Sequence, residues 1–150
     1  KFIGEQTILT PHMGEMSRLC GLDVSKLKED PVARAYQYAE KSGGVLVLKD
    51  ACTVVTDQNE KLYLNLSGNS GMATAGSGDV LSGIIAAVLC MYLSCEEEQE
   101  LSYKAALAVY IHGLCGDIAR EKKGSHGMTA KDMIEALPEV LKLAEVQSKE

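Results

Sequence analysis

The hydrophobic and polar positions of this chain follow two periods in turn. Alternating or unbroken apolar residues are typical of strands, and apolar residues three and four apart are typical of helices. In order, these patterns predict a strand over residues 6–10, helices over 14–20 and 31–42, strands over 45–49, 53–56 and 61–65, and helices over 79–93, 98–122, 129–136 and 138–146. We therefore expect a layered α/β fold with a mostly parallel sheet that contains one antiparallel hairpin.

Three segments indicate where the core lies. Residues 45–48 are uninterrupted Val and Leu, which is typical of a strand covered on both faces. The helix over 79–93 is apolar on nearly every side, so we expect it to be central and buried. In the first helix, Met16, Leu19 and Cys20 share one side, which predicts a face turned toward the core.

The balance of elements bears on the extent of the domain. About four predicted strands stand against six predicted helices, which leaves little sheet for the last helices to cover. From this imbalance we expect residues 1–150 to be the C-terminal part of a single larger domain. No internal repeat or low-complexity linker divides the sequence.

Composition narrows the class of protein. The chain has 150 residues, of which 46% are hydrophobic and 24% charged, and its formal net charge is −6. Its basic residues are scattered, which argues against nucleic acid or an anionic membrane as a partner. The longest apolar run, residues 84–93, is about half of a membrane span. The N-terminus lacks a signal-peptide layout, so we expect a cytoplasmic protein.

The cysteines are odd in number and form no C-x-x-C pair. Most of them stand among apolar residues, so we interpret Cys20, Cys52, Cys90, Cys95 and Cys115 as small buried side chains in a reducing compartment. This interpretation assigns no chemistry to them.

The densest chemical signal is the stretch NLSGNSGMATAGSGDVLSG, residues 65–83, which places five glycines around one carboxylate. The first N–H groups of a helix lack partners within the helix, and glycines let a ligand approach the backbone closely. Gly76, Ser77 and Gly78, just before an apolar helix, therefore predict an anion site. Asp79 would repel a phosphate that it did not serve, so we interpret it as the base for a substrate hydroxyl that attacks a phosphoryl group.

Three stretches are together similar to one known family. Residues 9–19, LTPHMGEMSRL, resemble its L-T-P-H-x-G-E-x-x-R-L, residues 48–53 resemble its L-K-G-x-x-T, and residues 65–83 resemble the signature of the ribokinase-like superfamily. In order and spacing, the three resemble the NAD(P)H-hydrate dehydratase family, whose domain is often fused to an epimerase. The resemblance covers essentially the whole chain, and it implies a ribokinase-like fold whose N-terminal half lies outside this chain.

The resemblance implies an enzyme that uses ADP or ATP, with Mg²⁺, to phosphorylate and expel the hydroxyl of hydrated NADH or NADPH. By motif, it implies that His12 contacts the hydrated nicotinamide nucleotide and that Asp79 meets this substrate as the base. It implies a nucleotide site lined by Lys49, Asp50, Ala51, Cys52, Thr53, Gly76, Ser77 and Gly78. A homo-oligomer, a tetramer, is also implied. Asp50 replaces the family glycine, which puts an unfavourable carboxylate beside a phosphate.

Structural interpretations of the same residues stay open. Asp79 would also suit a helix cap, and so would His12, which follows a strand end where α/β sheets bind ligands. Lys49 ends a buried strand and either reaches water or contacts a phosphate. Asn65 and Asn69 either shape the turn or contact the loop or Mg²⁺-bound waters.

Two further histidines are interpreted structurally. His112 shares a helical stripe with apolar residues, which favours a packed side chain over a ligand. His126 stands in G-S-H-G, a glycine loop in which flexibility matters more than the imidazole.

Two other functions would use part of the same machinery. A vitamin-precursor or sugar kinase on the same fold would share Asp79 and the glycine loop, but it would not need T-P-H-x-G-E. A non-catalytic nucleotide-binding module is the third hypothesis.

Overall fold

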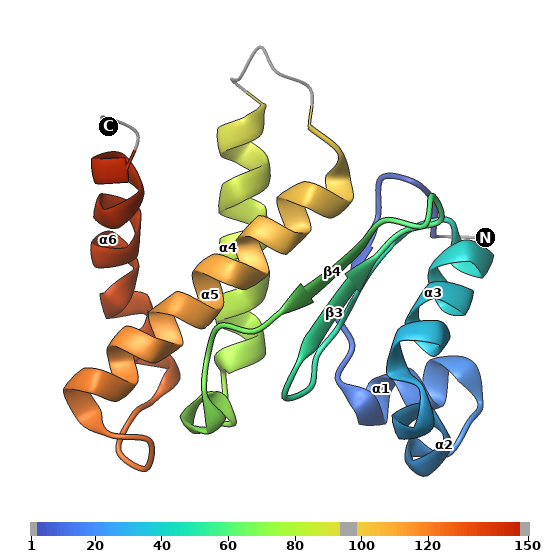
Figure 1. Cartoon of the computed structure of the whole chain (residues 1–150), viewed down its shortest axis with the longest axis horizontal. Coiled ribbons are helices and arrows are strands. Elements are labelled where there is room, and N and C mark those ends of the chain that lie inside the picture. The colour runs from blue at the N-terminus through green and yellow to red at the C-terminus, as the bar shows by residue number, and fades with distance from the viewer. Residues whose placement is uncertain (1–2, 94–98, 148–150) are drawn as a thin grey trace. The chain divides into compact units, whose positions relative to one another are not determined.

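Figure 1 shows the computed structural model of the chain, which describes residues 3–93 and 99–147. The contacts within it form two compact units, residues 1–65 with 95–106 and residues 66–94 with 107–150. Each unit has a hydrophobic core of its own. None of the described helices combines the length and the hydropathy that a bilayer crossing needs.

The first unit contains the sheet. Its elements are β1 (Ile8–Leu9), α1 (Met13–Cys20), α2 (Val24–Glu29), α3 (Pro31–Ser42), β2 (Val45–Leu48), β3 (Thr53–Thr56) and β4 (Leu62–Asn65). The strand order is β1-β2-β3-β4. Among the described strands, the parallel pairing that we expected to dominate is confined to β1 and β2, and the other two pairings are antiparallel. Residues 49–52 and 57–61 are too few to make the long crossover that a parallel pairing needs.

Short-range signals set the helix ends in this unit. The Asp30 carboxylate accepts the Ala33 N–H at 2.9 Å, so α3 begins where the Asp-Pro pair predicts. Gly21 and Gly43 end α1 and α3 with left-handed φ values of 67° and 79°, which favour glycine. The hydrophobic pattern does not predict α2, because its single buried side chain, Leu27, reveals no period.

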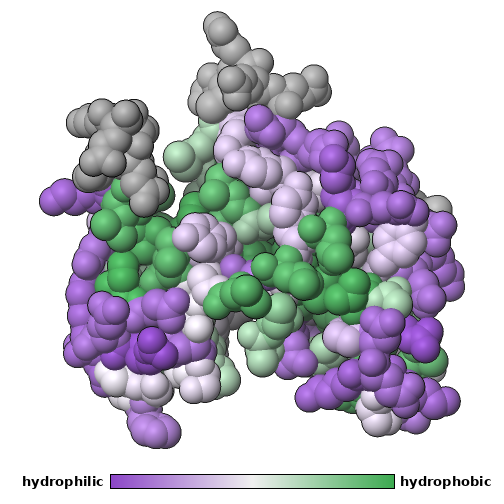
Figure 2. Space-filling model, in the orientation of Figure 1, coloured by the Kyte–Doolittle hydropathy of each residue, from purple (hydrophilic) through white to green (hydrophobic). Residues whose placement is uncertain are grey.

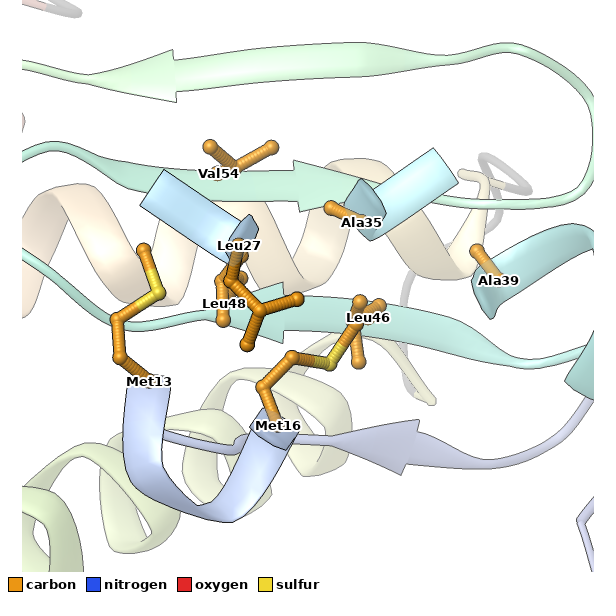
Figure 3. Packing of buried hydrophobic residues seen from close by; sticks show 8 residues of the cluster. All are labelled: Met13, Met16, Leu27, Ala35, Ala39, Leu46, Leu48 and Val54. Atoms are coloured by element: carbon orange, nitrogen blue, oxygen red, sulfur yellow. The ribbon is translucent and has the colours of Figure 1, made fainter. Parts of the chain in front are cut away.

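Three helices cover one face of the sheet. Figure 3 shows side chains from these helices directed at Leu46 and Leu48 of β2 and Val54 of β3. The helix members of this cluster are Met13 and Met16 of α1, Leu27 of α2, and Ala35 and Ala39 of α3. The predicted core position of Leu19 is wrong, because this side chain is 46% exposed. Since α1 begins one residue earlier than predicted, Met13 joins Met16 on the inward face instead.

The second unit is helical. Its elements are the 3₁₀ turn η1 (Ser70–Met72), α4 (Ser77–Tyr92), most of α5 (Leu101–Lys123, which begins in the first unit) and α6 (Ala130–Gln147). The predicted division of the last segment into two helices is wrong, because Pro138 lies inside α6. Ala136 and Val140 are buried on either side of it. Their packing therefore holds the helix together across the backbone N–H that proline lacks.

The apolar helix α4 is buried on one side only. Leu81, Ile84 and Val88 are buried, whereas Ala87 is exposed and Met91 is 59% exposed. The prediction of a helix buried on nearly every side is therefore wrong for the described structure. An apolar composition shows that any face of a helix can be buried, but it does not show which faces have neighbours.

The cysteines differ in burial. Cys115 is buried, and its burial raises the pKa of the thiol to about 11. Cys20 is half-buried, and Cys52 and Cys90 are exposed, so the interpretation of buried cysteines is wrong for the latter two. Cys95 lies outside the described residues, as does residue 98, where the next helix was expected to begin.

The contrast between Met16 and Leu19 gives a test of the first core. Met16→Ala removes a fully buried side chain, so we expect it to lower the free energy of unfolding by about 2–5 kcal/mol. Leu19→Ala truncates a half-exposed side chain on the same helix, and we expect a loss below about 1 kcal/mol. Urea unfolding followed by circular dichroism measures both. Equal losses would contradict this assignment of the α1 faces.

Candidate functional site

Parallel strand ends bring His12 and Lys49 together in the first unit. The two residues form an isolated parallel bridge beyond β1 and β2, and the Lys49 N–H donates to the Pro11 carbonyl at 2.9 Å. Residues 50–52 are exposed in the turn that leads to Thr53. The carboxyl ends of strands are where open α/β sheets bind ligands, so this part of the predicted site lies at a suitable edge.

His12 is the N-cap of α1. Its Nδ1 accepts the N–H groups of Gly14 and Glu15 at 3.0 and 3.2 Å, and Glu15 Oε2 accepts the His12 N–H at 2.8 Å. This reciprocal capping box gives the H-x-G-E spacing a structural cause. The backbone hydrogen bond from His12 lowers the pKa of Glu15.

The capping role leaves the other edge of the imidazole available. Because Nδ1 accepts hydrogen bonds, the proton of the neutral ring is assigned to Nε2. The side chain of His12 is 56% exposed, and Nε2 lies 3.6 Å from Glu15 Oε1. The capping interpretation is therefore confirmed, and it is compatible with the predicted contact to a ligand.

In the second unit, α4 starts from glycine backbone. Gly76 is the N-cap with a left-handed φ of 87°, and no side chain caps the first turn. In the described part of the chain, no hydrogen bond engages the Gly78 N–H. An open N–H at the positive end of a helix dipole suits an anion.

Asp79 stands in the first turn of α4 and is exposed. The alternative in which its carboxylate caps the helix is wrong, because no side chain accepts from the first turn. Within the described residues, its carboxylate makes neither a hydrogen bond nor an ion pair. It is therefore available to a ligand next to the open Gly78 N–H.

The loop that leads to α4 is fastened to α5. Asn69 Oδ1 accepts the Gly71 N–H at 3.0 Å, and its Nδ2 donates to the Gly116 carbonyl at 2.9 Å and to Asp117 Oδ1 at 3.0 Å. Asp117 Oδ2 accepts the Gly68 N–H at 2.8 Å. The predicted loop role of Asn69 is thus observed, whereas Asn65 lies in β4 of the first unit.

Two glycines of α5 let the loop come close. A Cβ on Gly113 would lie 2.0 Å from Ser67 Oγ, and a Cβ on Gly116 would lie 2.2 Å from Met72 Sδ. The G-L-C-G-D run of residues 113–117 was not among the predicted site residues. Its signal in the sequence is a carboxylate and two glycines in the mostly apolar middle of α5.

Both histidines outside the main motifs lie near this loop. His112 is buried, as the packed interpretation predicts, and its Nε2 lies 3.4 Å from Ser77 Oγ. His126 is exposed in the loop after α5. In that loop, the Ser125 carbonyl oxygen lies 2.8 Å from where a Cβ on Gly71 would stand. The glycine loop is therefore packed between α5 and the turn that follows it.

The comparisons with known proteins agree with these motifs. Residues 3–139 match the family model of NAD(P)H-hydrate dehydratase. The chain belongs to this family. Over 136 residues it is 46% identical to the bifunctional NAD(P)H-hydrate repair enzyme of Thermofilum pendens, which covers 91% of this chain and 25% of that protein. Over 135 residues it is 34% identical to the ADP-dependent (S)-NAD(P)H-hydrate dehydratase of Bacillus subtilis. This match covers 90% of this chain and 47% of that protein.

Solved structures of family members and neighbours share the fold. The ADP/ATP-dependent NAD(P)H-hydrate dehydratase of Bacillus subtilis, co-crystallized with ATP/Mg²⁺ and soaked with CoA, matches at a TM-score of 0.80 and 35% identity, over 90% of this chain and 48% of that one. A ribokinase-like superfamily protein of Enterococcus faecalis matches at a TM-score of 0.75 and 32% identity. The match covers 93% of this chain and 45% of that one. The predicted ribokinase-like α/β fold is confirmed. The chain spans about half or a quarter of the length of these relatives.

Substitutions of His12 separate its cap from its predicted ligand contact. His12→Ala removes the acceptor for two N–H groups, and we expect it to cost about 0.5–2 kcal/mol of stability. His12→Asn keeps a good N-cap, so we expect near-native stability. Both variants lose the exposed Nε2 edge, whereas only His12→Ala loses the cap. Urea unfolding followed by circular dichroism measures the difference, and equal stability losses in the two variants would contradict the capping role.

The glycines of α5 and α4 form a second matched pair. Gly113→Ala forces a Cβ against Ser67, so we expect a loss of about 1–3 kcal/mol of stability. Gly83 has nothing within 4 Å of its Cβ position in α4, so Gly83→Ala should gain about 0.5–1 kcal/mol. Urea unfolding followed by circular dichroism measures both effects. Stability changes of the same sign would contradict the close approach at Gly113.

Proposed function

We propose that the protein uses ADP or ATP, with Mg²⁺, to dehydrate hydrated NADH or NADPH and so restores the reduced cofactor. Membership of the family and the names of its relatives support this reaction class. On this chain, the proposal rests on one observation: the exposed Asp79 carboxylate stands beside an unpaired N–H at the start of α4. An anion site and a base thus lie on adjacent residues.

The chemistry needs both. Hydroxide is a poor leaving group and phosphate is a better one, so the hydroxyl of the hydrate is first phosphorylated. Asp79 accepts the hydroxyl proton as the oxygen attacks the terminal phosphorus, and the nucleotide leaves as AMP or ADP. The C–O bond then breaks, phosphate departs with the electron pair, and loss of a proton from the neighbouring carbon restores the ring double bond.

The remaining residues bind and align the reactants. The open Gly78 N–H binds the transferring phosphate, and Gly76 and Ser77 form the turn that presents it. Positioning is the main protein contribution to such a step. Residues 49–53 line the adenosine phosphate site, with Lys49 as the cation. Asp50 is exposed, which lets its carboxylate turn toward water. His12 contacts the hydrated nicotinamide nucleotide through its open edge.

Magnesium fits as a companion of the nucleotide. Among the described residues, no three His, Cys, Asp or Glu side chains gather into a metal site. Mg²⁺ commonly binds through one or two carboxylates plus substrate phosphates, and Asp79 is an open carboxylate at the anion site. When bound, the ion neutralises phosphate charge.

The setting of the reaction is part of the same proposal. We place it in the cytoplasm, in a homo-oligomer such as a tetramer, with residues 1–150 as the C-terminal part of a single ribokinase-like domain. The bifunctional repair enzymes among the relatives support a second repair activity, which we assign to an epimerase domain, fused or separate.

Substitution of Asp79 tests the mechanism. With ADP or ATP and Mg²⁺, the wild-type protein should restore the absorbance band of reduced nicotinamide from hydrated NADPH. We expect Asp79→Asn to lower kcat by about 10²–10⁴-fold and to leave nucleotide binding intact. Asp23→Asn, an exposed carboxamide substitution at the start of α2 where no side-chain cap exists, should leave both unchanged.

Other results would assign another function. Phosphorylation of a small alcohol without recovery of the nicotinamide band would favour a kinase on the same fold. Nucleotide binding with neither activity would leave a binding module. Equal turnover in wild type and Asp79→Asn would remove Asp79 from the mechanism.

A further inference from the structure

The first unit contains a cavity that none of the residues assigned above lines. Its volume is about 310 Å³, and its lining residues are Asp30, Val32, Ala33, Tyr36, Thr56, Glu60 and Leu62. They come from the start of α3, the end of β3, the turn between β3 and β4, and the first residue of β4. The volume lies near the lower end of the range for small-molecule sites, about 300–1,000 Å³.

Thr56 lines this cavity from the sheet. It is 1% exposed, and its side chain follows Val54 by two residues, so it shares the sheet face that α3 covers. Among the residues that the structure describes, none makes a hydrogen bond with the Thr56 hydroxyl. A hydroxyl can both donate and accept, so it is open to a polar group of a ligand in the cavity.

The backbone at Glu60 is strained at the edge of the same cavity. Its φ is 61°, a left-handed value that no other described non-glycine residue adopts. Turns normally place Gly, Asn or Asp at such a position. Glu60 Oε1 instead accepts a long hydrogen bond of 3.4 Å from the Tyr36 hydroxyl. The turn geometry therefore gives no reason of its own for a glutamate at this position.

The charge on the cavity is negative. Asp30 and Glu60 are carboxylates, and none of the seven lining residues is basic. Two basic residues are neighbours in sequence and do not line the cavity: Lys61 pairs with Glu100 at 3.6 Å, and Arg34 donates to Gln37 Oε1 at 3.1 Å. Desolvation, together with the carboxylates of Glu60 and its acidic neighbours, raises the pKa of Tyr36.

The remaining wall is apolar. Val32 and Ala33 line one side, and Leu62 is 48% exposed on β4. Figure 2 shows hydrophobic surface gathered over β3 and β4. A ligand would therefore combine a positive charge with an apolar body, since an anion would be repelled and a neutral polar molecule would leave the apolar wall wet.

We propose that this cavity binds a small primary amine that carries one aromatic ring. Its ammonium group donates to Asp30, Glu60 and the Thr56 hydroxyl. The ring of the ligand covers Leu62 and packs against the Tyr36 side chain. The assignment is independent of the reaction proposed for Asp79.

A pair of probes isolates the charge. The protein is titrated with 2-phenylethylamine and, separately, with 2-phenylethanol, which has the same shape without the charge. Methyl and ring signals of Thr56, Leu62 and Tyr36 are followed by NMR. We expect the amine to shift these signals and to bind at least about tenfold more tightly than the alcohol, the value of one charge-assisted hydrogen bond.

Two variants test whether Glu60 binds the amine. Glu60→Gly relieves the left-handed backbone and removes the carboxylate, so we expect an equal or higher unfolding temperature with about tenfold weaker amine binding. Glu40→Gln, on the exposed side of α3 and not lining the cavity, should leave the affinity unchanged. This opposite movement of stability and binding is not expected of a structural glutamate.

Several results would overturn the proposal. Equal binding of amine and alcohol would reduce the cavity to an apolar groove. Native amine affinity in Glu60→Gly, or signals shifting elsewhere in the chain, would reject the assigned site. Tighter binding of a lysine-containing tripeptide would replace the small amine with a protein side chain.

Discussion

The carboxylate of Asp117 is the contact on which the glycine loop depends. A segment so rich in glycine loses much conformational freedom when it is ordered, so something outside the loop must hold it. Asp117 does so by accepting the Gly68 N–H and the Asn69 amide, and hydrogen bonds to an ionised group are among the stronger ones. The absence of side chains at Gly113 and Gly116 lets α5 come near enough for these bonds to form. The start of the glycine loop, at Gly68 and Asn69, is thereby fastened to α5.

The T-P-H-x-G-E stretch shows that one motif can carry two constraints. His12 and Glu15 satisfy each other's backbone through the capping box, which would preserve the pair even without a substrate. The same cap fixes the ring and leaves its Nε2 edge in solvent. A side chain that is already held loses less entropy on meeting a ligand. Helix stability and ligand contact therefore favour the same residue type here.

Local signals in the sequence predicted local structure well. Asp30 with its following proline, and the glycines after α1 and α3, act over a few residues and mark helix ends without help from the rest of the chain. Burial was harder, because Leu19 and Met91 are apolar and yet exposed, and only three-dimensional packing decides which side of a helix has neighbours. The glycine loop in the sequence pointed to Asp79, but only the structure shows that its carboxylate does not cap α4. Asp117 was missed because its partners lie almost fifty residues away in sequence.

Pro138 has a consequence for the end of the chain. Without an N–H at this position, the carbonyl of Ile134 loses its usual donor one turn ahead, so α6 lacks one backbone hydrogen bond while the helix continues through it. Ala136 and Val140, on either side of the gap, are buried in the same cluster as Met133. Most helical stability in proteins comes from such packing. The last helix therefore depends on its tertiary neighbours more than an uninterrupted helix would.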